Sequence, residues 1–333
     1  MKTNKDIYNA VNDAIIPRVI AGKISVVIPV RNEEKSIYEL YERLSRVLDS
    51  SSLPWEIILV EDSSTDDTVK KIKELGTRDN RVKALFLTRG FGHHVAITAG
   101  LDNANGDHIV IMDGDLQHRP EDIPRMLELY FKGYEIVYGK RVSKQSWIKQ
   151  KGSDALNYFS NLLSDSEINI NSSMFRVISK RVKDDICSMR EVGRFITGMM
   201  SWLSYPTAYI EIYEDKRKIG RSKYSLLRSM TLFTHGIISF STKPLIISTY
   251  LGFFIASVTF IWGLIFLIYR LIKGVDIPGY PSLILSVFFL GGLTLFVLGI
   301  IGHYLSVMFM QLQNRPLYVM KDSLNLRKTG SND

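Results

Sequence analysis

Two long stretches without a charged side chain limit most strongly what this chain of 333 residues can fold into. They cover residues 244–269 and 281–310, and His303 interrupts the second. Each is longer than the roughly 20 apolar residues that cross a hydrocarbon core of about 30 Å. The alternative is a helix pair buried in a soluble domain, but such long runs leave no polar face for water. The sequence therefore predicts transmembrane helices at 244–270 and 282–310, joined by a short external loop at 271–281.

The basic residues on either side of these runs predict how the chain is oriented. The connecting segment RLIKGVDIPGYP carries only Arg270 and Lys273. Lysines and arginines are more frequent outside it: Arg217, Lys218, Arg221, Lys223, Arg228 and Lys243 before the first run, and Arg315, Lys321, Arg327 and Lys328 after the second. The positive-inside rule then places the polar portion and both termini in the cytoplasm. The N-terminal MKTNKDIYNA agrees, because it lacks the apolar region of a cleavable secretion signal.

Net charge and cysteine content bound the partners and the compartment. A net charge of +8 could indicate nucleic acid binding, but the basic residues cluster beside the apolar runs, where anionic lipid headgroups attract them. We therefore expect a membrane partner and no nucleic acid. The single cysteine, Cys187, allows no disulfide within the chain and is expected in the core of a protein from a reducing compartment.

The first 141 residues alternate β-rich segments with amphipathic ones, which predicts an α/β fold with a mostly parallel sheet covered by helices on both faces. Strands are expected at 23–30, 55–62, 81–88, 107–115 and 134–141, and helices at 33–48, 66–75, 93–105 and 121–131. Later segments predict a helix at 147–163 and strands at 173–179 and 205–214. The expected divisions are an N-terminal extension at 1–22, a cytoplasmic domain at 23–224, an amphipathic juxtamembrane helix at 225–243, and a cytoplasmic tail at 311–333 that frays from Lys321.

Four polar segments follow predicted strands: PVRNEE, VEDSS, TRGFGHH and MDGDLQ. In a parallel sheet these segments meet at the carboxyl edge, where ligands bind in such folds. The last contains Asp113 and Asp115, one residue apart after a buried strand. An Asp-Gly pair is also a common turn, which is the alternative for this segment taken alone. Convergence of the four segments favours a binding site.

An Asp-x-Asp pair at a strand end suits a hard divalent cation, since Mg²⁺ takes one or two carboxylates and completes its shell with water and phosphates. Asp113 and Asp115 are therefore the predicted metal ligands, in a site that displaces a nucleoside diphosphate. Hydride chemistry is disfavoured, because PVRNEE lacks the glycine-rich turn of a dinucleotide-binding fold. Asp62 could accept a hydrogen bond from a base or ribose, or could cap the helix expected to begin near Asp66.

The segments SVVIPVRNEEKSI, EIILVEDSSTDDT, GFGHHVAITAGLDNANGD and IMDGDLQHRPEDIP, in this order and spacing, resemble the family 2 glycosyltransferases. The resemblance covers roughly residues 23–230 and is greatest to the polyprenyl-phosphate glycosyltransferases, including bacterial two-span members that glycosylate undecaprenyl phosphate. It implies a GT-A-type fold, a UDP-sugar donor, Mg²⁺ or Mn²⁺, and a place in the bacterial inner membrane. Relatives with two spans can assemble as tetramers, so a homotetramer is an expectation of the same kind.

The resemblance also implies roles for individual residues. Pro29, Arg31, Asn32, Glu33, Asp62, Gly92, Asp113 and Gln117 are expected at the donor, with Asp62 on the base and Gln117 beside the diphosphate. Asp113 and Asp115 match the metal-binding pair, and Arg141 matches a basic residue near the phosphates that is counted here as catalytic. The expected ligands of the lipid phosphate are Arg141, Lys149, Ser153 and Arg176, together with Arg221 and Lys223 from the basic segment DKRKIGRSKYS, part of which has the composition of a solvated charge run.

Three departures from the family pattern bear on the chemistry. Acidic residues that often precede Phe-Arg are missing from NINSSMFRV, so a general base there is absent or displaced. Arg31 stands where tyrosine is frequent, and QHRP replaces Gln-Asp-Pro-Pro, which we expect to tune donor choice. His118 is either a metal ligand or, with more weight, a residue outside the metal's own ligands.

The sequence thus predicts an inverting, metal-dependent transferase that moves a hexose from UDP to polyprenyl phosphate at the cytoplasmic leaflet. One rival is a processive polysaccharide synthase, but the Gln-x-x-Arg-Trp motif and additional spans of that class are missing from the sequence. Another rival is a membrane scaffold that keeps the fold without catalysis, a reading supported by the missing acidic residues. Turnover with lipid phosphate separates these alternatives.

Overall fold

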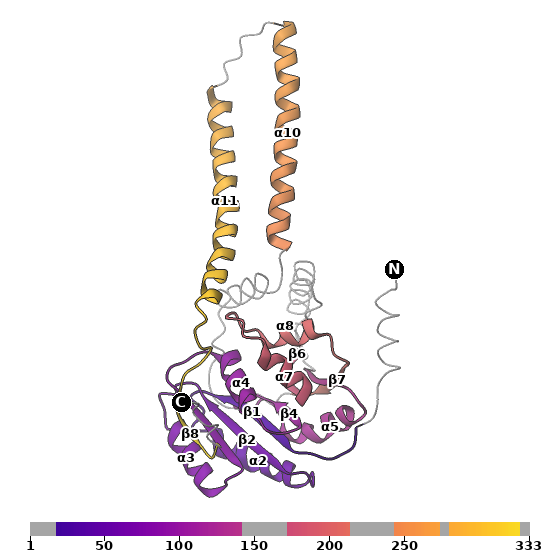
Figure 1. Ribbon diagram of the computed structural model, residues 1–333, viewed down its shortest axis with the longest axis vertical. Helices are drawn as coiled ribbons and strands as arrows, with labels where there is room; N and C mark the ends of the chain where they lie inside the picture. The colour runs from indigo at the N-terminus through magenta and orange to yellow at the C-terminus, as the bar shows by residue number, and fades with distance from the viewer. Residues whose placement is uncertain (1–17, 142–171, 214–242, 274–279, 327–333) are drawn as a thin grey trace. The chain divides into compact units, whose positions relative to one another are not determined.

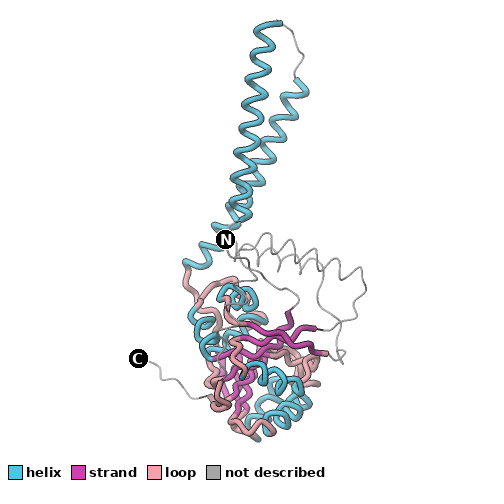
Figure 2. The backbone as a smooth tube through the Cα atoms, turned by 90° about the vertical axis from the view of Figure 1, so that its right-hand side faces the viewer, coloured by secondary structure: helices cyan, strands magenta, loops and turns pink. Residues whose placement is uncertain are grey.

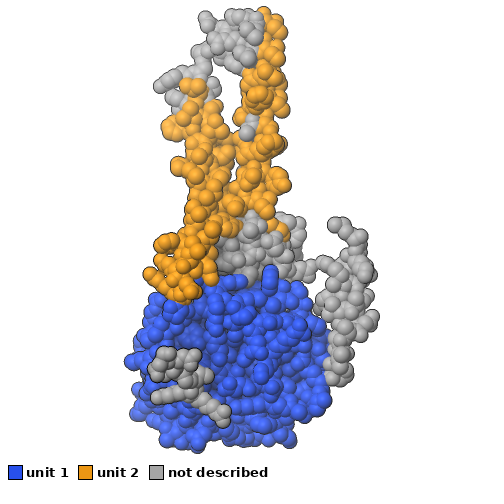
Figure 3. Space-filling model, viewed as in Figure 1, with its two compact units in different colours: residues 1–157, 168–224, 316–333 blue, residues 158–167, 225–315 orange. Residues whose placement is uncertain are grey.

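The computed structural model describes residues 18–141, 172–213, 243–273 and 280–326. The chain forms two compact units (Figure 3). The first contains residues 1–157, 168–224 and 316–333, and the second contains residues 158–167 and 225–315. The helices expected at 147–163 and 225–243 lie outside the described residues, apart from the last position of the second.

The first unit is built on one eight-stranded sheet with the order β7-β5-β6-β4-β1-β2-β3-β8 (Figure 1). β4, β1, β2 and β3 run parallel to one another; β6 is antiparallel to both β4 and β5, and β7 is parallel to β5. The strands are β1 (Ile24–Val30), β2 (Trp55–Glu61), β3 (Val82–Leu87), β4 (His108–Ile111), β5 (Ile136–Arg141), β6 (Ser172–Ser179), β7 (Thr207–Ile212) and β8 (Met320–Leu324).

Helices pack against this sheet, as the alternating sequence predicts (Figure 2). They are α2 (Ile37–Asp49), α3 (Thr68–Arg78), α4 (His93–Asp102), α5 (Ile123–Phe131), α7 (Lys180–Ser188) and α8 (Ile196–Leu203), with a short 3₁₀ turn, η1 (Pro120–Asp122). α2 buries Leu40, Leu44 and Leu48, the positions with helical spacing in the sequence. α4 approaches the sheet at Gly100, where an added Cβ would lie 2.3 Å from Val27 Cγ1.

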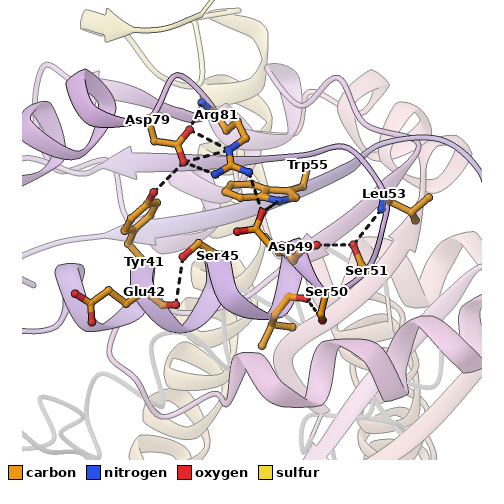
Figure 4. A network of polar contacts seen from close by, with 12 residues as sticks. Tyr41, Glu42, Ser45, Asp49, Ser50, Ser51, Leu53, Trp55, Asp79 and Arg81 are labelled. Atoms are coloured by element: carbon orange, nitrogen blue, oxygen red, sulfur yellow. Dashed lines mark hydrogen bonds and ion pairs between the residues drawn. The ribbon is translucent and has the colours of Figure 1, made fainter.

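Polar contacts fix the amino edge of the sheet, where the strands begin (Figure 4). The Arg81 guanidinium lies 3.8 Å from the Trp55 ring centroid and pairs with Asp49 and Asp79 at 2.8 and 2.9 Å. Trp55 Nε1 donates to Asp49 Oδ1 at 2.9 Å. These contacts tie the end of α2 to the first residue of β2 and to the residue before β3.

Glu56 of β2 forms a buried charge cluster in the same part of the sheet. Its carboxylate pairs with Lys23 and Lys83, and it accepts hydrogen bonds from Ser25 Oγ at 2.6 Å and from the N–H of Asn105 at 3.0 Å. Burial alone would raise the pKa of Glu56, but these hydrogen bonds outweigh it and lower the pKa to about 2. The ionised carboxylate is therefore stabilised by folding.

Glu56→Gln is expected to destabilise the first unit by about 3 kcal/mol at neutral pH, because it leaves two lysines without their buried partner. The folded-state pKa is lower than that of an ordinary glutamate, so the stabilisation is present above about pH 5 and is lost as the pH falls towards about 2. Thermal unfolding of wild type and variant at pH 7 and pH 3 measures this. The exposed Glu128→Gln serves as control; an equal gap between wild type and Glu56→Gln at both pH values would contradict the account.

The second unit contains two long apolar helices, α10 (Lys243–Lys273) and α11 (Tyr280–Leu312). Within them, Leu245–Ile265 and Ser286–Leu312 are long and apolar enough to cross a membrane, with mean hydropathies of 1.9 and 2.0. Almost none of these two segments is buried inside the protein. Both lie within or close to the predicted spans at 244–270 and 282–310, so they are candidate membrane helices.

The expectation of a frayed tail from Lys321 is wrong for its first residues. Met320–Leu324 form β8, which pairs antiparallel with β3 at the edge of the sheet. Tyr318 OH donates to Asp102 Oδ2 at 3.0 Å, and Asn325 Nδ2 donates to the carbonyls of Gly76 and Val82 at 2.7 and 2.9 Å. The segment MKDSL is mostly exposed on both faces. It therefore lacks the alternation of apolar and polar residues by which a half-buried strand is identified in a sequence.

Candidate active site at the carboxyl edge of the sheet

The Asp113–Asp115 segment lies against the end of β1, as the parallel arrangement predicts. Ile111, the last residue of β4, is level with Val27, and the N–H of Met112 donates to Val27 O at 3.2 Å. The chain then passes Pro29 and Val30: a Cβ on Gly114 would lie 2.9 Å from Val30 Cγ1 and 3.4 Å from Pro29 O. Glycine is therefore required between the two aspartates for packing, and Pro29 forms part of the neighbouring wall.

The two carboxylates differ in their surroundings. Asp113 Oδ1 is buried and has no hydrogen-bond partner among the described residues, although His93 Nε2 lies 3.3 Å away. Asp115 Oδ1 accepts from the N–H of Gln117 at 3.1 Å, across a turn in which Leu116 has a φ of 62°. A buried carboxylate oxygen with no hydrogen-bond donor is a costly feature unless a ligand satisfies it.

His118 holds the backbone of the Asp113–Asp115 turn by a hydrogen bond. Its Nδ1 accepts from the N–H of Asp113 at 3.1 Å, which places the ring proton on Nε2, and Nε2 donates to Ser173 Oγ at 2.7 Å. The ring is 3% exposed and stacks on Phe175 at a centroid distance of 5.2 Å. The nitrogen nearest Asp113 is thus already used by the backbone. This contact favours the second expectation for His118, a residue that positions the Asp113–Asp115 segment without being a metal ligand.

Asp62 holds the loop that precedes α4. Its two carboxylate oxygens accept from the N–H groups of Phe91 at 2.7 Å and Gly92 at 3.1 Å, and its side chain is almost fully buried. Arg31 Nη1 lies 3.8 Å from the same carboxylate. The alternative in which Asp62 caps the following helix is wrong, because Asp66 Oδ1 accepts from the N–H of Thr68 at 3.1 Å instead. Contact of Asp62 with a nucleotide base stays a prediction.

Asn32 and Glu33 connect the loops after β1 and β2. Asn32 adopts a φ of 58°, its N–H donates to Ser64 Oγ at 3.0 Å, and its Oδ1 accepts from the N–H of Thr65 at 2.8 Å. The N–H of Glu33 donates to Thr68 Oγ1 at 2.8 Å. These bonds explain why polar residues follow both strands, and they leave the exposed Arg31 beside Gly90 at the surface of the site.

Arg176, which is expected to bind the lipid phosphate, is fully buried in this structure. The side chain is 0% exposed; its guanidinium donates to Ser173 O at 3.0 Å and Thr197 Oγ1 at 3.1 Å, and it lies 5.0 Å from the Tyr138 ring. Across the described ranges no carboxylate lies within 4 Å of it. Burial lowers its pKa, and nearby Tyr138 and Asp113 oppose that effect. Contact of Arg176 with a lipid phosphate stays a prediction.

The remaining residues expected at the lipid phosphate are not brought to the site by the described structure. Arg141 is the last residue of β5 and is level with Ile212 of β7. Lys149, Ser153, Arg221 and Lys223 lie outside the described residues. Their roles, and that of Arg141, stay predictions.

Two histidines that the sequence analysis did not assign begin α4 next to these carboxylates. His93 faces Asp113, and His94 packs edge-on against Phe195 with a centroid distance of 5.5 Å. Burial, His93 and Arg176 lower the pKa of His94 to about 3, so its ring is neutral at physiological pH. The available signal was a His-His pair after a glycine, directly behind a strand.

The residues at this edge fit a divalent cation whose ligands come partly from the protein and partly from a substrate. In the part of the chain that the structure describes, no three His, Cys, Asp or Glu side chains form a complete metal site. Asp113 and Asp115 supply hard oxygen ligands, and among the described residues Asp113 Oδ1 accepts no hydrogen bond, although His93 Nε2 lies 3.3 Å away. Such a set suits Mg²⁺ or Mn²⁺ if water and phosphate oxygens complete the shell.

Comparison with known proteins agrees with this fold. Residues 25–189 match the model of glycosyl transferase family 2. The chain is 35% identical to the uncharacterized glycosyltransferase YkcC of Bacillus subtilis, covering 91% of this chain and 94% of that protein. It is 36% identical to the SfII prophage-derived bactoprenol glucosyl transferase of Shigella flexneri, covering 90% and 98%.

A solved structure extends the agreement to the fold. Glucosyl-3-phosphoglycerate synthase from Mycobacterium tuberculosis, in complex with phosphoglyceric acid, superposes with a TM-score of 0.51 at 17% identity, covering 70% of this chain and 82% of that one. The predicted GT-A-type, mostly parallel sheet flanked by helices is thus confirmed. On its sequence match and on its extensive identity to these relatives, the chain belongs to glycosyl transferase family 2.

Proposed function

We propose that this protein transfers a hexose from a nucleoside diphosphate sugar, with UDP as the expected nucleotide, to polyprenyl phosphate at the cytoplasmic face of the membrane. The observation that carries the proposal is the Asp113–Asp115 turn at the carboxyl edge, in a chain that also has two candidate membrane helices. The bactoprenol glucosyl transferase of Shigella flexneri, which matches over 90% of this chain, supports a polyprenyl acceptor.

Asp113 and Asp115 would hold a Mg²⁺ or Mn²⁺ ion against the donor diphosphate. When bound, such an ion supplies Lewis-acid stabilisation for the negative charge of the departing nucleoside diphosphate. The protein's own part is positional. His118 fixes the backbone of Asp113, and the close packing of Gly114 on β1 fixes the spacing of the two carboxylates.

The transfer needs no general base from the protein. A phosphate monoester has a second pKa of about 6, so at neutral pH the lipid phosphate is mostly dianionic and nucleophilic. One of its oxygens attacks the anomeric carbon while the bond from that carbon to the diphosphate breaks and its electron pair leaves with the nucleotide. Configuration inverts at the anomeric carbon. This chemistry accommodates Ser173 and Met174, which precede Phe175 where the family pattern often has acidic residues.

Pairing of β8 with β3 supports the proposed topology. The chain leaves the first unit for the second after residue 224 and rejoins it at residue 316. Because β8 belongs to the same sheet as β1–β4, the segment that follows α11 and the segment that precedes α10 are parts of one folded domain. The two segments can share one side of the membrane only if the chain between them crosses it twice or not at all. The distribution of lysines and arginines favours two crossings with the sheet domain in the cytoplasm.

Release of nucleoside diphosphate on addition of lipid phosphate tests the proposal. Detergent-purified protein is incubated with Mn²⁺ and a panel of UDP-, GDP-, TDP- and CDP-sugars, with and without undecaprenyl phosphate. Lipid-dependent release from one donor is expected. Release that does not depend on lipid would contradict the acceptor assignment, and no release from any donor would favour a scaffold. Long polymer as product would favour a processive synthase.

A further inference from the structure

His93 lies at the metal-binding segment, and the proposed chemistry gives it no role so far. It is the first residue of α4; its Nε2 is 3.3 Å from Asp113 Oδ1, and its side chain is 41% exposed. Its ring also meets the His94 ring edge-on, with 5.7 Å between the two ring centroids. Within the described residues, His93 therefore makes no hydrogen bond through its ring, and a ligand that reaches Asp113 also reaches His93.

The backbone at this junction carries further unpaired donors. Gly92 precedes α4 with a φ of 97° and no side-chain cap, and the first helical hydrogen bond runs from the N–H of Ala96 to Gly92 O at 2.9 Å. No acceptor within the described ranges takes the N–H groups of His93, His94 or Val95. The first turn of this ten-residue helix thus presents the partial positive charge that binds phosphate groups.

Two polar side-chain atoms next to the first turn of α4 are buried. Asp113 Oδ1 and His94 Nδ1 are both buried without a hydrogen-bond partner in the described chain. A buried polar atom without a hydrogen-bond partner destabilises the fold unless a ligand or water satisfies it. The loop before α4, whose first turn contains His94, is fixed in place, since Asp62 accepts from the N–H groups of Phe91 and Gly92. The junction thus places polar atoms that accept no hydrogen bond from the described residues next to Asp113, where a polar ligand can contact them.

We propose that His93 is a catalytic residue that donates a hydrogen bond from its imidazole to the donor diphosphate, together with the first-turn N–H groups of α4. The proposal rests on the proposed function, because it needs a nucleoside diphosphate at Asp113 and Asp115. The diphosphate gains negative charge as the bond to the sugar breaks, and a fixed donor aimed at that charge stabilises the transition state more than the ground state.

The test compares diphosphate with monophosphate binding. Full-length protein in detergent is titrated calorimetrically, in Mn²⁺, with the diphosphates and monophosphates of uridine, guanosine, thymidine and cytidine. His93→Ala is expected to reduce the preference for the best diphosphate over its monophosphate by about tenfold and to leave monophosphate affinity unchanged. Turnover should fall about 10²-fold, as when one fixed donor to a developing anion is removed. His93→Gln, which keeps an N–H donor, should restore part of both.

Asn103→Ala is the matched control, because it removes one hydrogen bond at the other end of α4, to Ala99 O at 2.9 Å, and should leave both affinities unchanged. The inference is overturned if His93→Ala keeps the full diphosphate preference, or if it weakens both nucleotides equally while its melting temperature falls. Wild-type protein that binds none of the diphosphates would overturn the inference and the proposed function together. If the wild type binds the diphosphate and transfers the sugar, and His93→Ala does both equally well, the inference alone is overturned.

Discussion

Asp115→Asn is expected to reduce transfer to polyprenyl phosphate by at least about 10³-fold, a loss comparable to removal of a principal electrostatic stabiliser of a transition state. Asparagine has nearly the same shape, but it removes one of the two negative charges that would hold the cation against the diphosphate. The amide oxygen can still accept from the N–H of Gln117, which Asp115 Oδ1 accepts at 3.1 Å in the wild type. The turn should therefore survive and the variant should fold.

Initial rates at saturating Mn²⁺, with the melting temperature of the same preparation, measure this effect. Asp184→Asn provides a matched control, since Asp184 is an exposed aspartate of α7 that pairs with Lys183 at 2.8 Å. We expect the control to retain wild-type rates. Near-wild-type turnover in Asp115→Asn would exclude Asp115 as a metal ligand, whereas a large fall in its melting temperature would show that the carboxylate is needed for folding.

Deleting residues 316–333 is expected to destabilise the first unit strongly. The deletion removes β8 from the edge of β3, the two hydrogen bonds of Asn325 and the contact of Tyr318 with Asp102. Each hydrogen bond contributes about 0.5–1.5 kcal/mol, so together with the lost packing of Leu324 the cost is at least about 3 kcal/mol. That is a large part of the stability of an ordinary domain. The bare edge of β3 also becomes a site for aggregation.

Thermal unfolding and size-exclusion chromatography of truncated proteins measure the contribution of β8. Deletion of residues 327–333 alone keeps β8 and is the control. Gly76→Val tests the same contact by a point change, because a Cβ at this position would lie 2.3 Å from Leu324 Cδ2. If the protein lacking residues 316–333 melts at the wild-type temperature as a single species, β8 contributes little to the fold.

Much of the sheet could be predicted from the sequence, because its strands are buried on both faces. β1 and β2 are fully buried over seven residues each, and such strands appear in a sequence as continuous apolar runs. Parallel strands also have their carboxyl ends at one edge, which was enough to bring Asp113 and Asp115 next to Pro29. β8 could not be predicted in this way. It is short, polar and largely exposed, and its place in the sheet depends on a partner more than 230 residues earlier.

The parts of the site that the sequence did not predict depend on side-chain direction. Nothing in QHRP shows that His118 turns inward to accept from the N–H of Asp113. Likewise, nothing in SMFRVIS shows that Arg176 is buried beneath α8. The expected contact of Asp62 with a nucleotide base stays a prediction, but nothing in VEDSS shows that the Asp62 oxygens also hold the loop before α4. His93 lies opposite Asp113 because that loop is fixed, a relation that no local pattern encodes.

The mass of the lipid product is the most direct test of the central claim that the Asp113–Asp115 edge transfers a sugar to polyprenyl phosphate. Wild type and Asp115→Asn are incubated with undecaprenyl phosphate, Mn²⁺ and the donor that gives lipid-dependent nucleotide release, and the extracted lipid is analysed by mass spectrometry. The account predicts lipid phosphate heavier by one hexose residue with the wild type and unchanged lipid with the variant. Unmodified lipid in the wild-type reaction, or equal amounts of product from both proteins, would contradict it.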